Sequence, residues 1–387
     1  MSHSLTSEDL VQLVRRVFLP GPDDTTAAFI VDLPDEASPD TAAWKARREM
    51  AAAWVEALRS EREALPIEID LYVYRNTRAM NADLPAGAWL HQGGPLPPNA
   101  GALDVAAQVT FDDIFKTHRI FFAPTEFSAT APLKIAAKKF NFRAATMPGF
   151  SEAMIPMLRL DYGEINRRVI LLKKLIDDAV QAEIFFEVDE SDDYHIKVDL
   201  RHRKSHASGG LFPHPGEAGN LPSGETYIVP YEGEIDGDPS RTQGELPVQF
   251  GDEVVVYRVV QNRALGVFGE GPAADRERAL IKDEPAYANI AELGFGVLAD
   301  FGIKPLGDLL SDEKLGFHIA FGRSDHFGGV VGAAQFTRPD AVVHSDRVYI
   351  PEMQPRVKVR SLSLRMNDHN VVPIMQDGQY VIYFRKY

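Results

Sequence analysis

The sequence predicts an N-terminal doubly wound α/β domain followed by a mostly β domain of α+β class. In the first half, short apolar runs alternate with long segments of helical periodicity, as in parallel sheets whose strands are joined by helices. From about residue 183, short β-type runs follow one another with few helices between them. The 387 residues are enough for two separate cores. We therefore expect domains at 1–185 and 186–387.

The first half supplies the alternating elements in order. Thr6 or Ser7, followed by Glu8 and Asp9, is typical of a capped helix start. After this helix the pattern predicts a strand at 25–35, a long helix at 41–65, a strand at 67–77, a strand, loop and helix over 118–140, a strand at 142–147 and a helix at 165–182.

The second half is dominated by short runs of β-branched and aromatic residues. These runs lie at 183–190, 194–202, 226–234, 252–261, 316–322, 341–350, 357–364 and 379–384. The clear exception is the charged segment 272–284, which has helical character. This change of pattern places the expected boundary between residues 185 and 186.

Composition excludes several classes of function. The chain has no cysteine, so any metal must be held by His, Asp and Glu. The formal net charge of -15 argues against a nucleic-acid partner, because phosphate binding needs a basic surface. We find neither a signal peptide nor an apolar run of about 20 residues, and therefore expect a cytoplasmic protein without a membrane partner.

The segment 316–351 carries the residues best suited to bind a metal. Two apolar runs each contain a histidine, His318 and His344, and Asp346 follows the second. In a strand, residues i and i+2 point to the same side, so His344 and Asp346 would share one face. Two imidazoles and a carboxylate suit zinc, cobalt, manganese or iron. The alternative is that all three are ordinary surface or packed polar residues.

Two glutamates extend this set. Glu225 ends a Gly- and Pro-rich loop directly before a β-type run, and Glu292 lies at an expected helix end before a Gly-rich turn. Each alone is typical of a solvated residue. Together they would supply the extra carboxylates that a site with two metal ions requires.

Other motifs point to no second activity. The basic segment 201–210 is expected to be a solvated loop, with a clamp for a substrate carboxylate as the alternative. The chain contains no G-x-G-x-x-G, P-loop, G-x-S-x-G or H-E-x-x-H signature. A nucleotide cofactor is therefore not expected.

Four segments, NLPSGETYIVP, AELGFG, DEKLGFHIAFG and VVHSD, resemble in order and spacing the aminopeptidase T and aminopeptidase S type leucyl aminopeptidases of the thermophilic metalloprotease family. The resemblance covers about 143–387 and extends to the rest only in general architecture. It implies a homodimer that acts on a peptide or small amide. It also implies two divalent ions of zinc, cobalt, manganese or magnesium type, held by Glu225, Glu292, His318, His344 and Asp346.

In this family a metal-bridging water attacks the peptide carbonyl, and Glu225 would also accept a proton. One departure concerns the residue that follows the H-I-A histidine by seven positions. The family places a tyrosine there to steady the oxyanion, whereas this chain has Asp325, followed by His326. A carboxylate would repel an oxyanion. Asp325 or His326 is instead expected to act as acid or base, or as a further ligand.

Two alternatives follow from the same residues. The 2,5-dihydroxypyridine dioxygenases are similar in fold and hold a single non-haem Fe(II), for which His318, His344 and Asp346 have the required ligand types. The presence of Glu225 and Glu292 favours the two-metal hydrolase. The missing tyrosine favours a third possibility, a non-catalytic binding module on the same fold.

Overall fold

A computed structural model describes residues 4–338, 341–382 and 384. The chain forms two compact units: unit 1 comprises the chain up to Ile165 together with Gly210–Ser223, and unit 2 comprises Asn166–Gly209 and the chain from Gly224 onward. This division differs from the expected boundary between residues 185 and 186. The chain passes into unit 2 within a helix, and a short later segment returns to unit 1.

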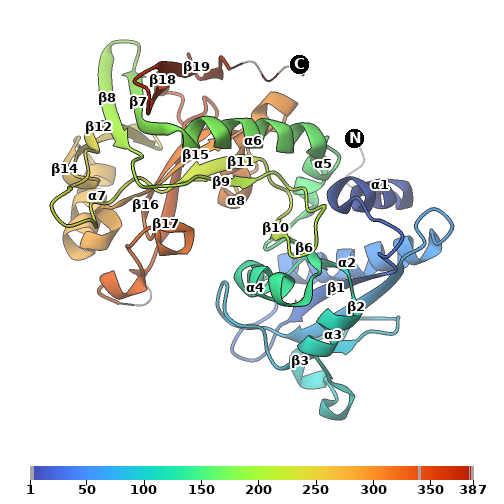
Figure 1. The fold of residues 1–387 in the computed structure, drawn as a ribbon. Coiled ribbons are helices and arrows are strands. Elements are labelled where there is room, and N and C mark those ends of the chain that lie inside the picture. The colour runs from blue at the N-terminus through green and yellow to red at the C-terminus, as the bar shows by residue number, and fades with distance from the viewer. Residues whose placement is uncertain (1–3, 339–340, 383, 385–387) are drawn as a thin grey trace. The chain divides into compact units, whose positions relative to one another are not determined.

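Unit 1 is built on a seven-stranded sheet with the order β10-β6-β5-β1-β2-β3-β4 (Figure 1). Its strands are β1 (Thr26–Leu33), β2 (Glu68–Arg75), β3 (Gly87–Leu90), β4 (Val109–Thr110), β5 (Ile120–Ala123), β6 (Arg143–Thr146) and β10 (Ala218–Asn220). β1 runs parallel to both β2 and β5. The chain moves from β1 to β2 and later returns to β5 on the other side of β1, which is the order of a doubly wound sheet.

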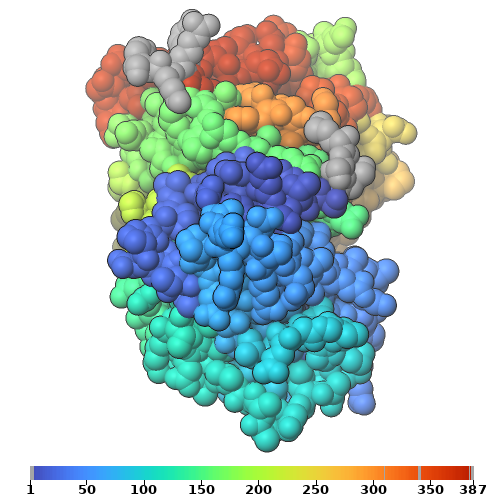
Figure 2. All heavy atoms as spheres, turned by 90° about the vertical axis from the view of Figure 1, so that its right-hand side faces the viewer, coloured from blue at the N-terminus to red at the C-terminus, as the bar shows by residue number. Residues whose placement is uncertain are grey.

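The helices of unit 1 form for local reasons that the sequence shows. α1 (Ser7–Phe18) begins at a capping box, in which Thr6 and Asp9 bind each other's backbone N–H. The others are α2 (Ala42–Ser60), α3 (Phe111–Thr117), α4 (Thr130–Phe140) and α5 (Ile155–Leu158). Figure 2 shows the face of unit 1 on which α1 and α2 lie, in dark and medium blue.

Unit 2 consists mainly of two antiparallel sheets. The larger has the order β14-β13-β12-β8-β7-β18-β19-β20. Its strands are β7 (Ala179–Val188), β8 (Asp192–Asp199), β12 (Gln243–Phe250), β13 (Glu253–Val260), β14 (Arg263–Phe268), β18 (Val357–Met366), β19 (Val371–Gln376) and β20 (Gln379–Tyr380). The helices of this half are α6 (Tyr162–Asp177), which enters it from unit 1, α7 (Pro272–Asp283) and α8 (Leu309–Asp312).

The smaller sheet of unit 2 has five strands in the order β17-β16-β15-β11-β9. They are β9 (His206–Ser208), β11 (Glu225–Ile228), β15 (Ile290–Gly296), β16 (Phe317–Gly322) and β17 (His344–Val348). Every residue of β15 and β16 is buried. Strands covered on both faces read as continuous apolar runs, which is why their sequences do not alternate.

The predicted fold class, α/β followed by a mostly β region, is confirmed, and three local predictions were wrong. The helix expected at 165–182 ends at Asp177, and β7 begins at Ala179. Glu292 does not end a helix but lies inside the buried strand β15, because a short apolar run does not distinguish helix from strand. Part of the expected loop 201–210 forms the edge strand β9.

Among the described residues, no helix is long and apolar enough to cross a membrane.

Candidate functional site

The five candidate metal ligands lie on one face of the five-stranded sheet. Directly opposed residues of antiparallel strands, and residues two apart on one strand, project to the same side. The register pairs Glu225 with Gly296 and Ala320 with both Glu292 and Asp346. Together with the alternation along each strand, these pairs place Glu225, Glu292, His318, His344 and Asp346 on a common face.

Small residues clear the space between these side chains. Gly294 lies on β15 directly opposite His318 of β16. A Cβ atom at position 294 would lie 1.9 Å from His318 Nε2, so the imidazole occupies the place that a side chain would take. Ala320 stands between Glu292 and Asp346. The polar side chains can therefore lie close together because Gly294 and Ala320, the residues between them, have no side chain or only a methyl group.

Two groups of potential ligands share Glu292. The first comprises Glu225, Glu292 and His318, the second comprises Glu292, His344 and Asp346, and within each group the ligand atoms lie within 4.8 Å of one another. His318 Nε2 lies 3.3 Å from Glu292 Oε1, and His344 Nε2 lies 3.1 Å from Glu292 Oε2. The structure thus brings all five predicted residues together, with one carboxylate between the two imidazoles.

Both imidazoles are oriented as in metal-binding histidines. His318 Nδ1 donates to the carbonyl of Gly316 at 3.1 Å, and His344 Nδ1 donates to the carbonyl of Arg323 at 2.7 Å. A carbonyl oxygen only accepts, so each ring directs Nε2 toward the carboxylates. This backbone contact is the usual second partner of a metal-ligating histidine.

The electrostatic balance of the cluster favours a positive charge within it. Burial acts to lower the pKa of His318, but the hydrogen bond and charge of Glu292 and the charges of Asp346 and Glu225 raise it to about 10. Burial also acts to lower the pKa of His344, but the hydrogen bonds and charges of Asp346 and Glu292 outweigh it and raise the pKa well above its usual value. Without a metal ion, protons on the imidazoles supply the charge that the buried carboxylates require.

A buried lysine, which the sequence analysis did not single out, completes the cluster. Lys314 is 2% exposed, and its Nζ donates to Glu225 Oε1 at 3.0 Å and to a carboxylate oxygen of Glu313. Burial raises the pKa of Glu313 to about 8, against the charge of Lys314. Both residues lie in a 3-10 turn, Glu313–Leu315, directly before β16. The sequence offered one indication of their role, because both residues stand just before the FHIAF run that carries His318.

The residues present fit a bound metal. Two buried carboxylate oxygens, Glu225 Oε2 and Asp346 Oδ1, have no hydrogen-bond partner among the residues that the structure describes, and each belongs to a different ligand group. A buried polar atom without a partner is costly, and a cation at each position would satisfy it. The donor set, carboxylates and imidazoles without sulfur, suits zinc, cobalt or manganese.

Asp325 and His326 lie in a turn beside the cluster. Asp325 accepts from Arg323 Nε at 2.6 Å, so its charge is paired. The His326 ring lies 5.4 Å from that of His344, edge to face. Burial, followed by the positive charges of His344 and Arg323, lowers the pKa of His326 to about 4. Neither residue belongs to the two ligand groups.

A second residue absent from the sequence-based set holds this turn in place. Glu232, whose side chain is 3% exposed, accepts 2.6 Å hydrogen bonds from Ser324 Oγ, Asn289 Nδ2 and the backbone N–H of Val330. Arg203 pairs with the same carboxylate at 3.3 Å. Glu232 therefore ties both ends of the turn to the sheet that bears the ligands.

Aromatic rings line one side of the cluster. The ring of Phe327 contacts His344 at 5.5 Å and Tyr227 at 4.8 Å, and Tyr227 stacks on His206. His206 Nε2 also donates to the carbonyl of Phe327 at 3.0 Å. These contacts connect His206 of β9, Tyr227 of β11 and His344 of β17, with Phe327 of the turn packed between the last two.

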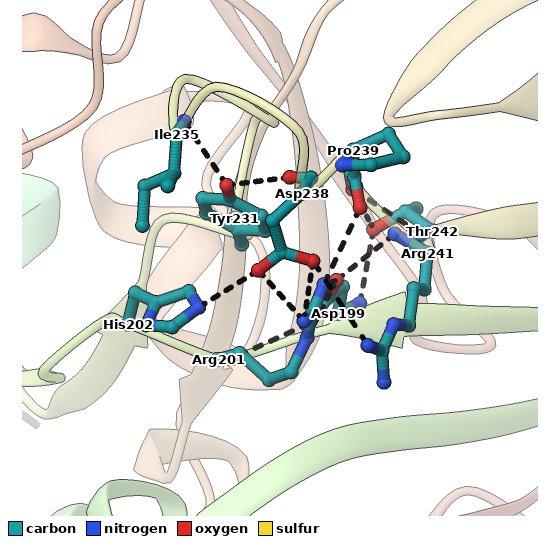
Figure 3. A network of polar contacts seen from close by, with 10 residues as sticks. Asp199, Arg201, His202, Tyr231, Ile235, Asp238, Pro239, Arg241 and Thr242 are labelled. Carbon is teal, nitrogen blue, oxygen red and sulfur yellow. Dashed lines mark hydrogen bonds and ion pairs between the residues drawn. The ribbon is translucent and has the colours of Figure 1, made fainter.

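The first two residues of the basic segment 201–210 are engaged with acidic side chains of unit 2, whereas Arg203 and His206 of the same segment lie beside the cluster. Arg201 binds the carboxylates of Asp199 and Asp238, and His202 Nε2 lies 3.1 Å from Asp238 (Figure 3). Tyr231 donates to the carbonyl of Asp238 and accepts from the N–H of Ile235. Arg201 thus fixes a loop within unit 2.

The solved structures that are similar to this chain along nearly its whole length include two enzymes. 2,5-Dihydroxypyridine dioxygenase from Pseudomonas putida KT2440 has 15% sequence identity and a TM-score of 0.61, covering 98% of each chain. Wild-type AmpT from Thermus thermophilus has 14% identity and a TM-score of 0.51, covering 97% of this chain and 99% of that one. No model of a known protein family and no curated protein sequence matches. At these identities the likeness shows the fold.

Proposed function

We propose that this protein is a metal-dependent hydrolase of the aminopeptidase type, which uses two divalent cations to cleave an amino-terminal peptide bond or a related small amide. The observation that carries the proposal is the position of Glu292. It is shared by two ligand groups, and His318 and His344 fall in different groups. A shared carboxylate with separate terminal ligands is the arrangement that two ions require. The likeness of the fold to AmpT supports the aminopeptidase type.

When bound, two such ions lower the pKa of a water molecule and polarise the substrate carbonyl. Glu292 holds the centre of the site, with one oxygen toward each imidazole. Lys314 fixes Glu225 by its Oε1, which leaves Oε2 to bind a cation or accept a proton. In this proposal the neutral His326 imidazole takes up a proton during the reaction, whereas Asp325 does not, because Arg323 binds it.

Metal content tests the shared role of Glu292. We expect about two divalent ions per chain by elemental analysis of protein loaded with zinc or cobalt. Glu292→Gln should lose both ions, whereas Asp346→Asn should lose only the ion held with His344. Glu183→Gln is the matched control, because Glu183 also pairs with a histidine, His195 at 2.9 Å, but belongs to neither group of potential ligands found among the described residues.

Hydrolysis is measured on the same loaded samples with L-leucine p-nitroanilide and a short peptide. Release of the amino-terminal residue that requires both ions supports the proposal. A wild-type protein that holds a single iron, and keeps it after substitution of Glu225 and of Glu292, would contradict it.

A second candidate is a ring-cleavage dioxygenase with one non-haem Fe(II). Two observations favour it: the likeness of the fold to 2,5-dihydroxypyridine dioxygenase, and the ion pair with Lys314, which engages Glu225 without a metal. Oxygen uptake with 2,5-dihydroxypyridine after anaerobic iron loading would support it. No uptake from protein that holds two ions would exclude it.

A further inference from the structure

We propose that Tyr227 is a catalytic residue of this site, whose phenolic hydroxyl donates a hydrogen bond to the substrate carbonyl oxygen as that oxygen becomes negatively charged. This inference rests on the proposed hydrolase function. It supplies the donor that neither the metal ligands nor the turn at Asp325 provides.

The position of Tyr227 follows from the strand register. Tyr227 lies two residues after Glu225 on β11, so both side chains project from the ligand-bearing face. Gly294 of the central strand β15 pairs with Tyr227 on one side and with His318 of β16 on the other. Because Gly294 has no side chain, no group of β15 stands between Tyr227 and His318. The phenol therefore projects from the same face of the sheet as the five candidate ligands.

The hydroxyl of Tyr227 is available to a ligand. Among the described residues it makes no hydrogen bond, and neither does the hydroxyl of Tyr194 on β8, whereas those of Tyr231, Tyr257, Tyr287, Tyr349 and Tyr380 in the same unit are engaged. The side chain is half-buried, and its hydroxyl is not among the buried polar atoms without a partner. A tyrosine hydroxyl without a partner among the described residues, on the face that carries the buried carboxylates, has the position and chemistry of a substrate contact.

The ring is also held rigidly. It is stacked on His206 at 5.2 Å, and Phe327 packs against it edge to face at 4.8 Å. Phe327 is in turn bound through its carbonyl to His206. A donor that is fixed before the reaction stabilises a developing charge without the cost of reorientation.

The charges around the site explain why such a donor is needed. Glu225, Glu292 and Asp346 are buried carboxylates that would bind the two cations in the proposed hydrolase, and none of them can donate a hydrogen bond to an oxyanion. Two cationic side chains near the site, Lys314 and Arg323, are already engaged, Lys314 with Glu225 and Arg323 with Asp325. The Tyr227 hydroxyl is uncharged and does not compete with the metal ions for these carboxylates.

The test compares Tyr227→Phe with Tyr194→Phe, a control on β8 in the same unit. Both variants keep the aromatic ring, so both should fold and hold the same ions by elemental analysis. Calorimetry measures binding of L-leucinephosphonic acid, a tetrahedral mimic, and of L-leucine. We expect Tyr227→Phe to weaken phosphonate binding by about tenfold or more and to lower kcat on L-leucine p-nitroanilide by about 100-fold, with KM and leucine binding little changed.

The two proposals fail in different ways. If the wild type hydrolyses the substrate and Tyr227→Phe binds the phosphonate and turns over as the wild type does, Tyr227 has no such role and the hydrolase function stands. If wild-type protein loaded with two ions hydrolyses neither substrate, the hydrolase function fails, and the role of Tyr227 fails with it.

Discussion

Lys314→Met should destabilise the metal-free protein strongly, because it leaves a buried carboxylate without its cation. The Lys314 side chain is 2% exposed and Nζ lies 3.0 Å from Glu225 Oε1. At that separation and an effective dielectric constant of about 20, the attraction is about 5 kcal/mol. Removing one partner of a buried pair typically costs about 3–5 kcal/mol. We expect the free energy of unfolding to fall by that amount.

The matched control is Lys304→Met. Lys304 pairs with Glu352 at 2.7 Å, but its side chain is 75% exposed, so the loss should stay below about 1 kcal/mol. Urea titration of chelator-treated protein, followed by far-UV circular dichroism, measures both variants. Added zinc should recover part of the loss in Lys314→Met, because a cation beside Glu225 replaces the missing charge. Equal losses in the two variants would refute the reasoning.

Three further predictions concern other parts of the chain. Burial raises the pKa of Asp32 to about 6, although the hydrogen bonds that its carboxylate accepts act to lower it. The folded protein therefore binds this proton more tightly than the unfolded chain does. The resulting stabilisation is complete below about pH 4 and is lost as the pH rises through about 6. Urea titrations across this range should show a decline of about 3 kcal/mol that Asp32→Asn removes; an unchanged decline would assign it to another group. Gly294→Ala should displace the His318 imidazole and lower the metal content measured by elemental analysis, and full metal content would show that the ring can shift. Glu232→Gln should free the turn before Val330, with faster amide hydrogen exchange there than in the wild type, and equal exchange would show that other contacts hold it.

The local pattern was enough to predict much of the fold. Alternating apolar runs and helical segments predicted the doubly wound sheet, because strand and helix periods differ along the chain itself. The same information failed for Glu292, whose short segment contains both Ala-Glu-Leu and two glycines. Its strand character is fixed by β11 and β16 on either side, which lie far away in sequence.

The candidate site was predicted only as far as its residue types allowed. His344 and Asp346 lie two apart on one strand, so their common face follows from the sequence. The proximity of Glu225 to Lys314 does not, because 89 positions separate them. Metal binding by the five candidate ligands remains a prediction, for which the shared Glu292 and the unpartnered oxygens are the structural grounds.

The sequence by itself determined the fold class, the absence of thiol chemistry and the set of side chains that can hold a metal, because these depend on composition and local periodicity. Only the tertiary structure decided which of them meet. The register of five strands sets Tyr227, Gly294 and His318 in one row and places Glu292 between two histidines. Register depends on pairing between distant segments, and a shift by one residue would turn these side chains to the opposite face.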